Sequence, residues 1–395
     1  MKRLHSMSGD PTRRRLIQAA LALPLLGPRD AFAAAPGYPR LMQGPMIGAV
    51  TPTSLTIWGR ASGPQPVAVE YATRRDLADA RLTAPVLARA ADDYTVRIEI
   101  PDLAPATRYW YRVRVDGQVD RYRRSPYAAR TAPASTQSFR VAFGSCSRTQ
   151  VDPVQPIFDA VRAAEPDLFL WLGDHVYGDT IEPSVLAEEY RRQRNVATLE
   201  PLLASVPQLA IWDDHDFGLN NSDRTNPMRE GALEVFRHYW ANPAFGLEGT
   251  PGVFFHYAYA GVDFFFLDGR YYRDPNTNRD GPGKTMLGAA QKAWLEDGLA
   301  RSRAPFKVLV SGSGWSTGDG PKGDTWSAFL HERNGLFDFI RDRGIGGVVL
   351  VSGDTHAGEL NCIQWSERGG YDLYDLVSSP LAQLPTETWM SLVPE

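Results

Sequence analysis

The chain has 395 residues, of which 43% are hydrophobic and 22% charged, a composition typical of globular proteins and unlike that of disordered or collagen-like chains. The formal net charge of −4 gives no electrostatic indication of nucleic-acid binding. This length allows two or three domains with a large core, and the presence of only two cysteines excludes a disulfide-dense scaffold.

The first 33 residues have the features of an export signal. Arginines at 13–15 precede an apolar run over residues 19–26, and Ala31 and Ala33 form a small-x-small cleavage site. This order predicts a twin-arginine signal, recognised by the twin-arginine export machinery, and a periplasmic or secreted protein; the alternative is a basic helix followed by a linker. Without this segment the net charge is −8, which suits cations better than polyanions. No later apolar run reaches about 18 residues, so we expect no transmembrane segment in the mature chain.

Residues 36–136 have the pattern of an all-β domain. Apolar and polar residues alternate with the period of half-buried strands over residues 54–58, 67–71 and 94–100. The segment 103–113 resembles the turn and strand of fibronectin type III sandwiches, and Asp116-Gly117 predicts a hairpin turn. We therefore expect a small β-sandwich here.

The pattern changes after a linker at residues 131–138 that is rich in Ala, Pro, Ser and Thr. Apolar strand-like runs now occur at residues 139–143, 168–172, 209–212, 264–267, 308–310 and 348–351. Amphipathic helical patterns lie between several of them, at residues 156–165, 184–203, 289–301 and 328–343. This alternation predicts a layered α/β domain over residues 137–395.

Polar motifs follow directly after five of the apolar runs. They are Gly144-Ser145-Cys146, Gly173-Asp174-His175-Val176-Tyr177, Asp213-Asp214-His215-Asp216, Asp268-Gly269-Arg270 and Gly353-Asp354-Thr355-His356. In open α/β sheets ligands bind at the carboxyl ends of strands, because the loops converge there. Carboxylate, imidazole, thiolate and phenolate groups are the donors that transition metals take. One such Asp alone is equally well explained by helix capping, but the ordered set predicts a metal centre.

The order of these motifs resembles the alkaline phosphatase D branch of the calcineurin-like metallophosphoesterases. The segments 267–273 and 286–295 are also similar to that family, and the resemblance runs from about Pro45 to the end of the chain. It implies a four-layer α/β/β/α metallophosphoesterase sandwich after the small fibronectin III-like domain. It also implies hydrolysis of phosphate esters with the help of two or more metal ions.

The resemblance assigns metal ligands residue by residue. One metal, ferric iron, would be held by Cys146, Asp174, Tyr177 and His356, because thiolate and phenolate favour a highly charged ion. Asp174 would bridge to a second metal, which Asp214 and Asp354 complete. Oxygen ligands suit calcium at that second site, and zinc or manganese stays open.

Further residues are candidates for catalysis and substrate binding. His215 lies beside a ligand without being one, which makes it the candidate general acid or electrostatic stabiliser. Contacts to phosphate or to the leaving group are expected from Asn220, Asn221 and Arg270, since the guanidinium fork matches phosphate. An ion pair of Arg270 with Asp268, and Asx turns at the two asparagines, are equally open.

The motifs depart from most calcineurin-like enzymes at several positions. Ser145-Cys146 stands where most have Asp-x-His, Asp214-His215 where they have Asn-His, and Asp354-x-His356 where they have two histidines. Ser311-Gly312-Ser313 replaces a further histidine ligand. The second site is therefore poor in nitrogen, and the identity and number of its metals stay open.

The sequence thus predicts an exported hydrolase of phosphate monoesters or diesters. The alternatives are an extracellular binding or adhesion protein and a metal-dependent hydrolase of another bond, such as an amide. The natural substrate and the oligomeric state do not follow, although the loops at 218–228 and 274–287 are the expected place of substrate selection. Structural roles are expected for His238, His256, His331 and a buried Cys362, while Asp179 either shapes its loop or touches a metal.

Overall fold

The computed structural model describes residues 38–120, 123, 125–316, 320 and 322–385. The expected export signal lies outside the described residues. None of the helices in the described part of the chain is long and apolar enough to cross a membrane.

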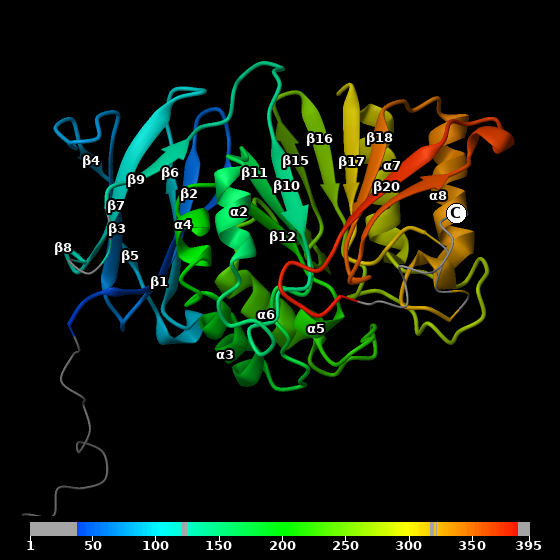
Figure 1. Cartoon of the computed structure of the whole chain (residues 1–395), viewed down its shortest axis with the longest axis horizontal. Helices are drawn as coiled ribbons and strands as arrows, with labels where there is room; N and C mark the ends of the chain where they lie inside the picture. The colour runs from blue at the N-terminus through cyan, green and yellow to red at the C-terminus, as the bar shows by residue number, and fades with distance from the viewer. Residues whose placement is uncertain (1–37, 121–122, 124, 317–319, 321, 386–395) are drawn as a thin grey trace, which may run out of the picture. The chain divides into compact units, whose positions relative to one another are not determined.

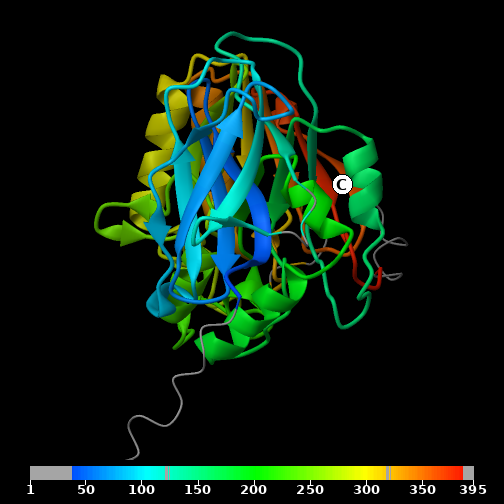
Figure 2. The same ribbon diagram turned by 90° about the vertical axis from the view of Figure 1, so that its left-hand side faces the viewer.

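The first described region is all-β, as the alternating pattern predicts. One antiparallel sheet has the order β1-β2-β6, and the other has the order β4-β3-β7-β8, with β5 beside β3 and β9 beside β7. Figure 2 shows the strands of this region, in blue and cyan, facing the viewer. The strands are β1 (Leu41–Val50), β2 (Leu55–Ala61), β3 (Pro66–Ala72), β4 (Arg81–Leu82), β5 (Val86–Leu87), β6 (Thr95–Ile100), β7 (Arg108–Val115), β8 (Gln118–Val119) and β9 (Tyr127–Arg130), with a 3-10 helix, η1 (Ala90–Asp92). Asp116 and Gly117 turn the chain between β7 and β8 with φ of 51° and 72°, which confirms the predicted hairpin.

The second region contains two larger sheets and a small hairpin. A parallel sheet has the order β10-β11-β12, and a mixed sheet has the order β15-β16-β17-β18-β20-β19 (Figure 1). The strands are β10 (Val141–Gly144), β11 (Leu168–Leu172), β12 (Gln208–Ile211), β13 (Gly246–Leu247), β14 (Thr250–Pro251), β15 (Phe255–Tyr259), β16 (Val262–Phe266), β17 (Phe306–Val310), β18 (Val348–Ser352), β19 (Gly358–Ile363) and β20 (Leu373–Ser378). The helices are α2 (Ile157–Ala163), α3 (Pro183–Gln193), α4 (Leu199–Leu203), α5 (Asp214–Phe217), α6 (Arg229–Tyr239), α7 (Gly288–Arg301) and α8 (Leu330–Asp342), with 3-10 helices η2 (Trp326–Phe329) and η3 (Ser366–Arg368).

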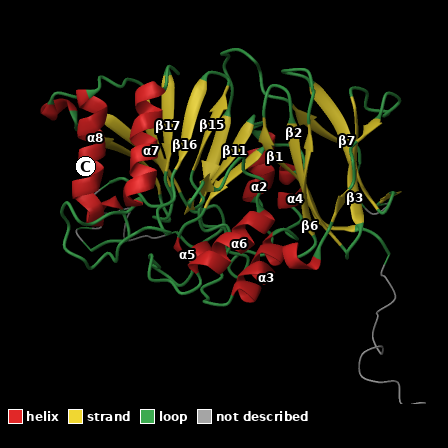
Figure 3. Ribbon diagram, turned by 180° about the vertical axis from the view of Figure 1, so that it is seen from behind, coloured by secondary structure: helices red, strands yellow, loops and turns green. Residues whose placement is uncertain are grey.

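The two sheets of this region share a core between them. Phe264 of β16 is buried in the same cluster as Leu170 of β11, whereas its neighbour Phe265 points the other way. Phe265 packs in a separate cluster with Leu295 of α7 and Phe337 of α8, the two helices that cover the mixed sheet in Figure 3. Burial of both faces explains why these strands read as continuous apolar runs.

Helices also cover the outer face of the parallel sheet. Phe158 of α2 packs against Trp171 of β11 with ring centroids 5.6 Å apart, and α4 contributes Leu202 to the same core. Together with the shared inner core and α7 and α8, this gives the predicted order of layers, α/β/β/α.

The observed elements differ from the predicted ones in two places. The helical pattern at 184–203 forms two helices, because the intervening residues make tertiary contacts: Arg194 is buried over the ring of Trp240, and Thr198 donates to the carbonyl oxygen of Val154. The hairpin β19–β20 was not predicted. Cys362 lies on its edge strand and is half-buried, contrary to the expected buried thiol, and both cysteines are free.

Candidate metal centre

The loops that follow β10, β11, β12 and β18 converge at one edge of the two sheets. The three strands of the parallel sheet end side by side, with Gly144 paired to Trp171 and Leu172 to Ile211. The backbone nitrogen of Cys146 donates to the carbonyl oxygen of Gly173 at 3.4 Å, and that of Ser147 to Asp174 at 2.8 Å. The sequence motifs are thus tied to one another through the backbone.

Glycine allows this close approach. A Cβ at Gly173, whose φ is 100°, would lie 2.5 Å from the Cβ of Asp213. A Cβ at Gly353 would lie 2.4 Å from the Oγ of Ser145, which in turn accepts a hydrogen bond from the backbone nitrogen of Asp354 at 3.1 Å. A side chain at either position would push the loops apart.

Sulfur, phenol and imidazole donors lie on one side of the centre. The Sγ of Cys146 is 3.4 Å from Oδ2 of Asp174, and the hydroxyl of Tyr177 is 3.2 Å from Nε2 of His356. Burial, followed by the charges of Cys146 and Asp174, raises the pKa of Tyr177. The four residues that the sequence groups around a first metal are therefore neighbours.

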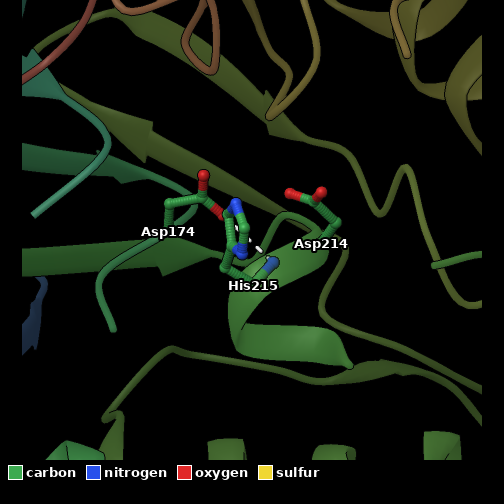
Figure 4. Close-up of side chains that lie close together, drawn as sticks. All are labelled: Asp174, Asp214 and His215. Carbon is green, nitrogen blue, oxygen red and sulfur yellow. Dashed lines mark hydrogen bonds between the residues drawn. The ribbon is translucent and has the colours of Figure 1, made fainter. Parts of the chain in front are cut away.

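Carboxylates dominate the other side. Ligand atoms of Asp174, Asp214 and His215 lie within 4.8 Å of one another, and so do those of Asp213, Asp214 and Asp354. In Figure 4 the carboxylates of Asp174 and Asp214 extend from the same face of the site, with the ring of His215 beside Asp174. One carboxylate oxygen of Asp214 accepts from the backbone nitrogen of Asn221 at 2.6 Å, and the other is buried without a hydrogen-bond partner in the described residues.

The electrostatics of this cluster are unfavourable without a positive charge. Burial, followed by the charge of Asp214, raises the pKa of Asp174, and burial followed by Asp213 and Asp214 raises the pKa of Asp354. The pKa of the Cys146 thiol is raised by burial and then by Asp174 and Asp354. A group of buried acids that oppose one another's ionisation is a binding site for multivalent cations.

The backbone at these positions is strained as well. The left-handed region is occupied by Cys146 (φ 60°), Asp174 (φ 52°), Asp354 (φ 71°) and His356 (φ 55°). Non-glycine residues adopt this region at a cost in free energy that the surrounding structure must offset, and such positions cluster at functional sites. All four were predicted metal ligands.

His215, the candidate acid, is oriented by a carboxylate. Its Nδ1 is 2.5 Å from Oδ1 of Asp179, and its ring lies over that of Tyr177 with centroids 4.2 Å apart. Burial alone would lower the pKa of His215, but the bond to Asp179 and the charges of Asp174 and Asp214 raise it to about 10. Because a carboxylate only accepts, the Nδ1 proton is directed at Asp179, and Nε2 is left for a substrate.

The three predicted substrate contacts differ in placement. The side chain of Asn220 is exposed, and Asn221 reaches the centre through its backbone nitrogen. The structure does not support a substrate contact for Arg270: its guanidinium is fully buried, 2.7 Å from Asp213 and 2.6 Å from Asp324. The alternative pair with Asp268 is also wrong for the side chain, because only the backbone nitrogen of Arg270 donates to Asp268.

Comparison with known proteins identifies the family. A model described as PhoD-like phosphatase matches residues 141–388, and a model of the PhoD-like phosphatase N-terminal domain matches residues 27–133. The chain belongs to the PhoD-like phosphatase family. Alkaline phosphatase D of Bacillus subtilis (strain 168) is 24% identical over 325 residues, which cover 69% of this chain and 54% of that protein. The chain thus spans about half the length of this curated relative.

Solved structures show the same fold. The structure of PhoD covers 89% of this chain and 78% of its own, with a TM-score of 0.74 at 20% identity. A purple acid phosphatase from yellow lupin (Lupinus luteus) covers 89% of this chain and 67% of its own, with a TM-score of 0.58 at 14% identity. The predicted architecture, an N-terminal all-β domain followed by an α/β metallophosphoesterase domain, is confirmed.

The donors of this PhoD-like chain fit a metal centre. One oxygen each of Asp213 and Asp214 is buried among other acids without a hydrogen-bond partner in the described residues, with Arg270 3.8 Å from that of Asp214, and a cation would compensate this charge. Thiol, phenol and imidazole groups stand beside them, a mixture that suits a transition metal on one side and a hard cation on the other. The residues present therefore fit metal binding at this site.

Sequence reasoning missed residues that support the centre. Asp213 precedes the predicted ligand Asp214 and joins its carboxylate group, although burial raises its pKa to about 6 against the opposing effect of Arg270. Asp324 forms ion pairs with both Arg270 and Arg273, at 2.6 Å and 2.8 Å. The repeated acid in the motif signals Asp213, but Asp324 lies in a loop with no pattern that points to the site.

Proposed function

We propose that this chain is a metal-dependent phosphoesterase that hydrolyses phosphate monoesters, diesters or both. The observation that carries the proposal is the convergence of buried and half-buried carboxylate, thiol, phenol and imidazole groups from four strand-end loops. Membership of the PhoD-like phosphatase family supports the same reaction class. Metal ions bound here would supply the activation of water and the positive charge that phosphoryl transfer requires.

The residues of the chain have separate tasks in this proposal. One ion, ferric iron, would be held by Cys146, Asp174, Tyr177 and His356. A second ion, calcium or else zinc or manganese, would be held by Asp174, Asp214 and Asp354. His215 donates its Nε2 proton to the oxygen of the leaving alcohol, and Asp179 holds the ring in position through Nδ1.

Activity assays test this function directly. Purified protein is assayed with p-nitrophenyl phosphate and bis-p-nitrophenyl phosphate before and after a chelator, and again after the metals are restored. We expect hydrolysis of at least one substrate, loss of it on chelation and recovery on reloading. Hydrolysis of neither substrate would favour a binding protein or a hydrolase of another bond. Activity that survives complete metal removal would also contradict the proposal.

Metal analysis tests the assignment of the ions. Protein isolated from its own host and analysed by inductively coupled plasma mass spectrometry should contain iron together with a second divalent metal. A phenolate or thiolate bound to ferric iron also gives charge-transfer absorption, which should lose the phenolate contribution in Tyr177→Phe and the thiolate contribution in Cys146→Ser. A single zinc per chain and no iron would contradict this assignment.

We further propose that the first 33 residues direct twin-arginine export. This segment, fused to a reporter and expressed in a bacterium with a twin-arginine translocase, should deliver the reporter outside the cytoplasm. Replacing Arg13 and Arg14 by lysine should retain the reporter in the cytoplasm, because the translocase reads the arginine pair. Unchanged export of that variant would contradict the proposal.

A further inference from the structure

A basic pocket of about 260 Å³ lies where the start of β6 meets the last turn of α6. Both elements are labelled in Figure 3. Its lining includes Arg89, Arg97, Arg237 and His238, with Asp92 as the single carboxylate. None of these residues belongs to the candidate metal centre. The pocket is locally positive although the chain as a whole is acidic.

The charge of this pocket is only partly neutralised by the protein, because Asp92 is the single carboxylate in its lining and acts on both Arg97 and His238. Asp92 is 3.8 Å from Nε2 of His238, and no carboxylate of the described residues lies within ion-pairing distance of Arg89, Arg97 or Arg237. Neighbouring arginines outside the pocket behave differently: Arg60 and Arg191 are both paired with Asp93, at 2.9 Å and 2.7 Å. The unpaired arginines therefore stand out from their surroundings.

Two of the arginines are held near each other by an aromatic ring. The guanidinium carbons of Arg97 and Arg237 lie 5.4 Å and 5.8 Å from the ring centre of Phe245, and Nη2 of Arg237 donates to the carbonyl oxygen of Phe245 at 3.4 Å. Burial, followed by the charge of Arg237, lowers the pKa of Arg97. Like charges positioned in this way repel each other until an anion lies between them.

Two carbonyl oxygens at the end of α6 that could otherwise accept hydrogen bonds from these arginines already have other donors. The carbonyl oxygens of His238 and Tyr239 accept from Trp58 and Arg194, at 2.7 Å and 3.0 Å. Exposed carboxylates at Glu99 and Glu234 are near in sequence, but neither lines the pocket nor forms an ion pair with these arginines. Most of the guanidinium hydrogen-bonding capacity stays available to a ligand.

We propose that this pocket binds a phosphate group. Guanidinium groups donate in a planar fork that matches the oxygens of phosphate, and two of them can share one group. The volume of the pocket is several times the ~30 Å³ of a water molecule, so the pocket admits a phosphate group together with part of the molecule that bears it. The source is either free inorganic phosphate or one phosphate of a polymer, and the proposal does not depend on the proposed activity.

Residue-resolved chemical protection tests the proposal on the full chain. Phenylglyoxal modifies free guanidinium groups, and mass spectrometry measures the modification rate at each arginine. Phosphate bound at the metal centre therefore does not affect the rates measured at the pocket. Inorganic phosphate and a short linear polyphosphate are used in separate arms. At about tenfold above the Kd, modification of Arg97 and Arg237 should slow about tenfold, because only the unliganded fraction reacts. Arg108, exposed on β7 and outside the pocket, should be unaffected.

The two arms identify the source, and matched variants test the geometry. Protection by inorganic phosphate assigns the pocket to free phosphate, and protection by polyphosphate alone assigns it to a polymer. Arg237→Gln should abolish the protection of Arg97, and Arg97→Gln that of Arg237, whereas Arg108→Gln should leave both protected. No protection in either arm, equal protection of Arg108, or full protection in both pocket variants would overturn the proposal.

Discussion

Two clusters of charged side chains in this molecule, one half-buried and one mostly buried, have opposite characters. Asp93, at the end of η1, is bonded to Arg60, Arg191 and Tyr239, and these partners lower its pKa although burial alone would raise it. At the strand ends, by contrast, burial and neighbouring acids raise the pKa of both Asp174 and Asp354. The first cluster is neutralised within the chain, and the second is not.

The difference separates a structural joint from a binding site. Arg60 lies on β2 and Arg191 on α3, so Asp93 links the all-β region to the helices of the second region by pairs that need nothing else. Among the described residues, the arginine that pairs with acids at the strand ends is Arg270, at 2.7 Å from Asp213 and 3.8 Å from Asp214, and Asp174 and Asp354 form no ion pair with an arginine or lysine. Removing a carboxylate should therefore destabilise the protein at the first cluster and relieve repulsion at the second.

The largest effect is expected at Asp174. Asp174→Asn should reduce phosphoesterase turnover at least about 10⁴-fold, because the carboxylate that we propose to hold both ions is lost. With a chelator present, the same variant should unfold at a temperature equal to or above that of the wild-type protein, since one repelling charge is gone. Activity, metal content and thermal unfolding are measured together.

Asp159→Asn is the matched control for this change. Asp159 lies on α2 and forms an exposed pair with Arg162 at 3.3 Å. The Asp159→Asn variant should keep the metal content, turnover and unfolding temperature of the wild-type protein. A metal-free Asp174→Asn protein that is clearly less stable than metal-free wild type would show that the acids at the strand ends are structural, as Asp93 is.

The next effect concerns His215, the candidate general acid beside Asp174 and Asp214. His215→Ala should retain the metals and slow turnover by about 10² to 10⁴-fold. The loss should be greater for an alkyl phosphate than for p-nitrophenyl phosphate, because nitrophenolate leaves readily without a proton. Steady-state rates on the two substrates measure this difference.

Asp179 provides the accompanying test of orientation. Asp179→Asn keeps a side chain beside Nδ1 of His215 but removes the charge. We therefore expect a smaller loss of turnover than in His215→Ala, with the same dependence on the leaving group. Full activity of His215→Ala would contradict a catalytic role. An equal loss on both substrates would favour stabilisation of phosphoryl oxygens over proton donation.

A third kind of buried acid is Asp375 on β20, which is held by hydrogen bonds from a serine and a backbone nitrogen and whose pKa the charge of Arg333 only weakly lowers. Its oxygens accept from Ser352 Oγ at 2.8 Å and 3.0 Å and from the backbone nitrogen of Trp315 at 3.1 Å, but burial raises its pKa to about 7. A folded pKa above the unfolded value near 3.8 favours the protonated form. The free energy of unfolding should therefore fall as pH rises from about 4 to about 7, by up to about 4 kcal/mol.

Asp375→Asn isolates this contribution. The amide can accept from Trp315 and donate to Ser352, so the variant should be more stable than the wild-type protein at pH 8 and should lose that advantage near pH 4. Denaturant unfolding of both proteins at the two pH values gives the difference. A gap that does not change with pH would contradict the assigned titration.

The sequence was sufficient to predict the layers and most of the centre. Apolar runs buried on both faces indicate parallel strands, and parallel strands bring the residues that follow them to one edge. Cys146, Asp174, Asp214 and Asp354 were located in this way, because each comes directly after such a run. Local order thus determined the positions of these side chains.

The destination of Arg270 could not be predicted by the same reasoning. Its partner Asp324 lies 54 residues away in a loop without strand or helix periodicity, and only the folded chain brings the two together. The division of the pattern at 184–203 also depends on distant contacts, such as Arg194 with Trp240. Local patterns do not encode pairs of this kind.

The smallest predicted effect tests the self-neutralised cluster itself. Asp93→Asn should lower the free energy of unfolding by about 2 kcal/mol, because Arg60 and Arg191 lose their shared carboxylate, and it should leave turnover and metal content unchanged. Asp76→Asn, which removes an exposed pair with Arg74 on the same domain, should change neither quantity measurably. Denaturant unfolding and the p-nitrophenyl phosphate assay measure both variants. A loss of metals in Asp93→Asn would mean that this joint holds the strand-end loops in place, so the two clusters would be parts of one system.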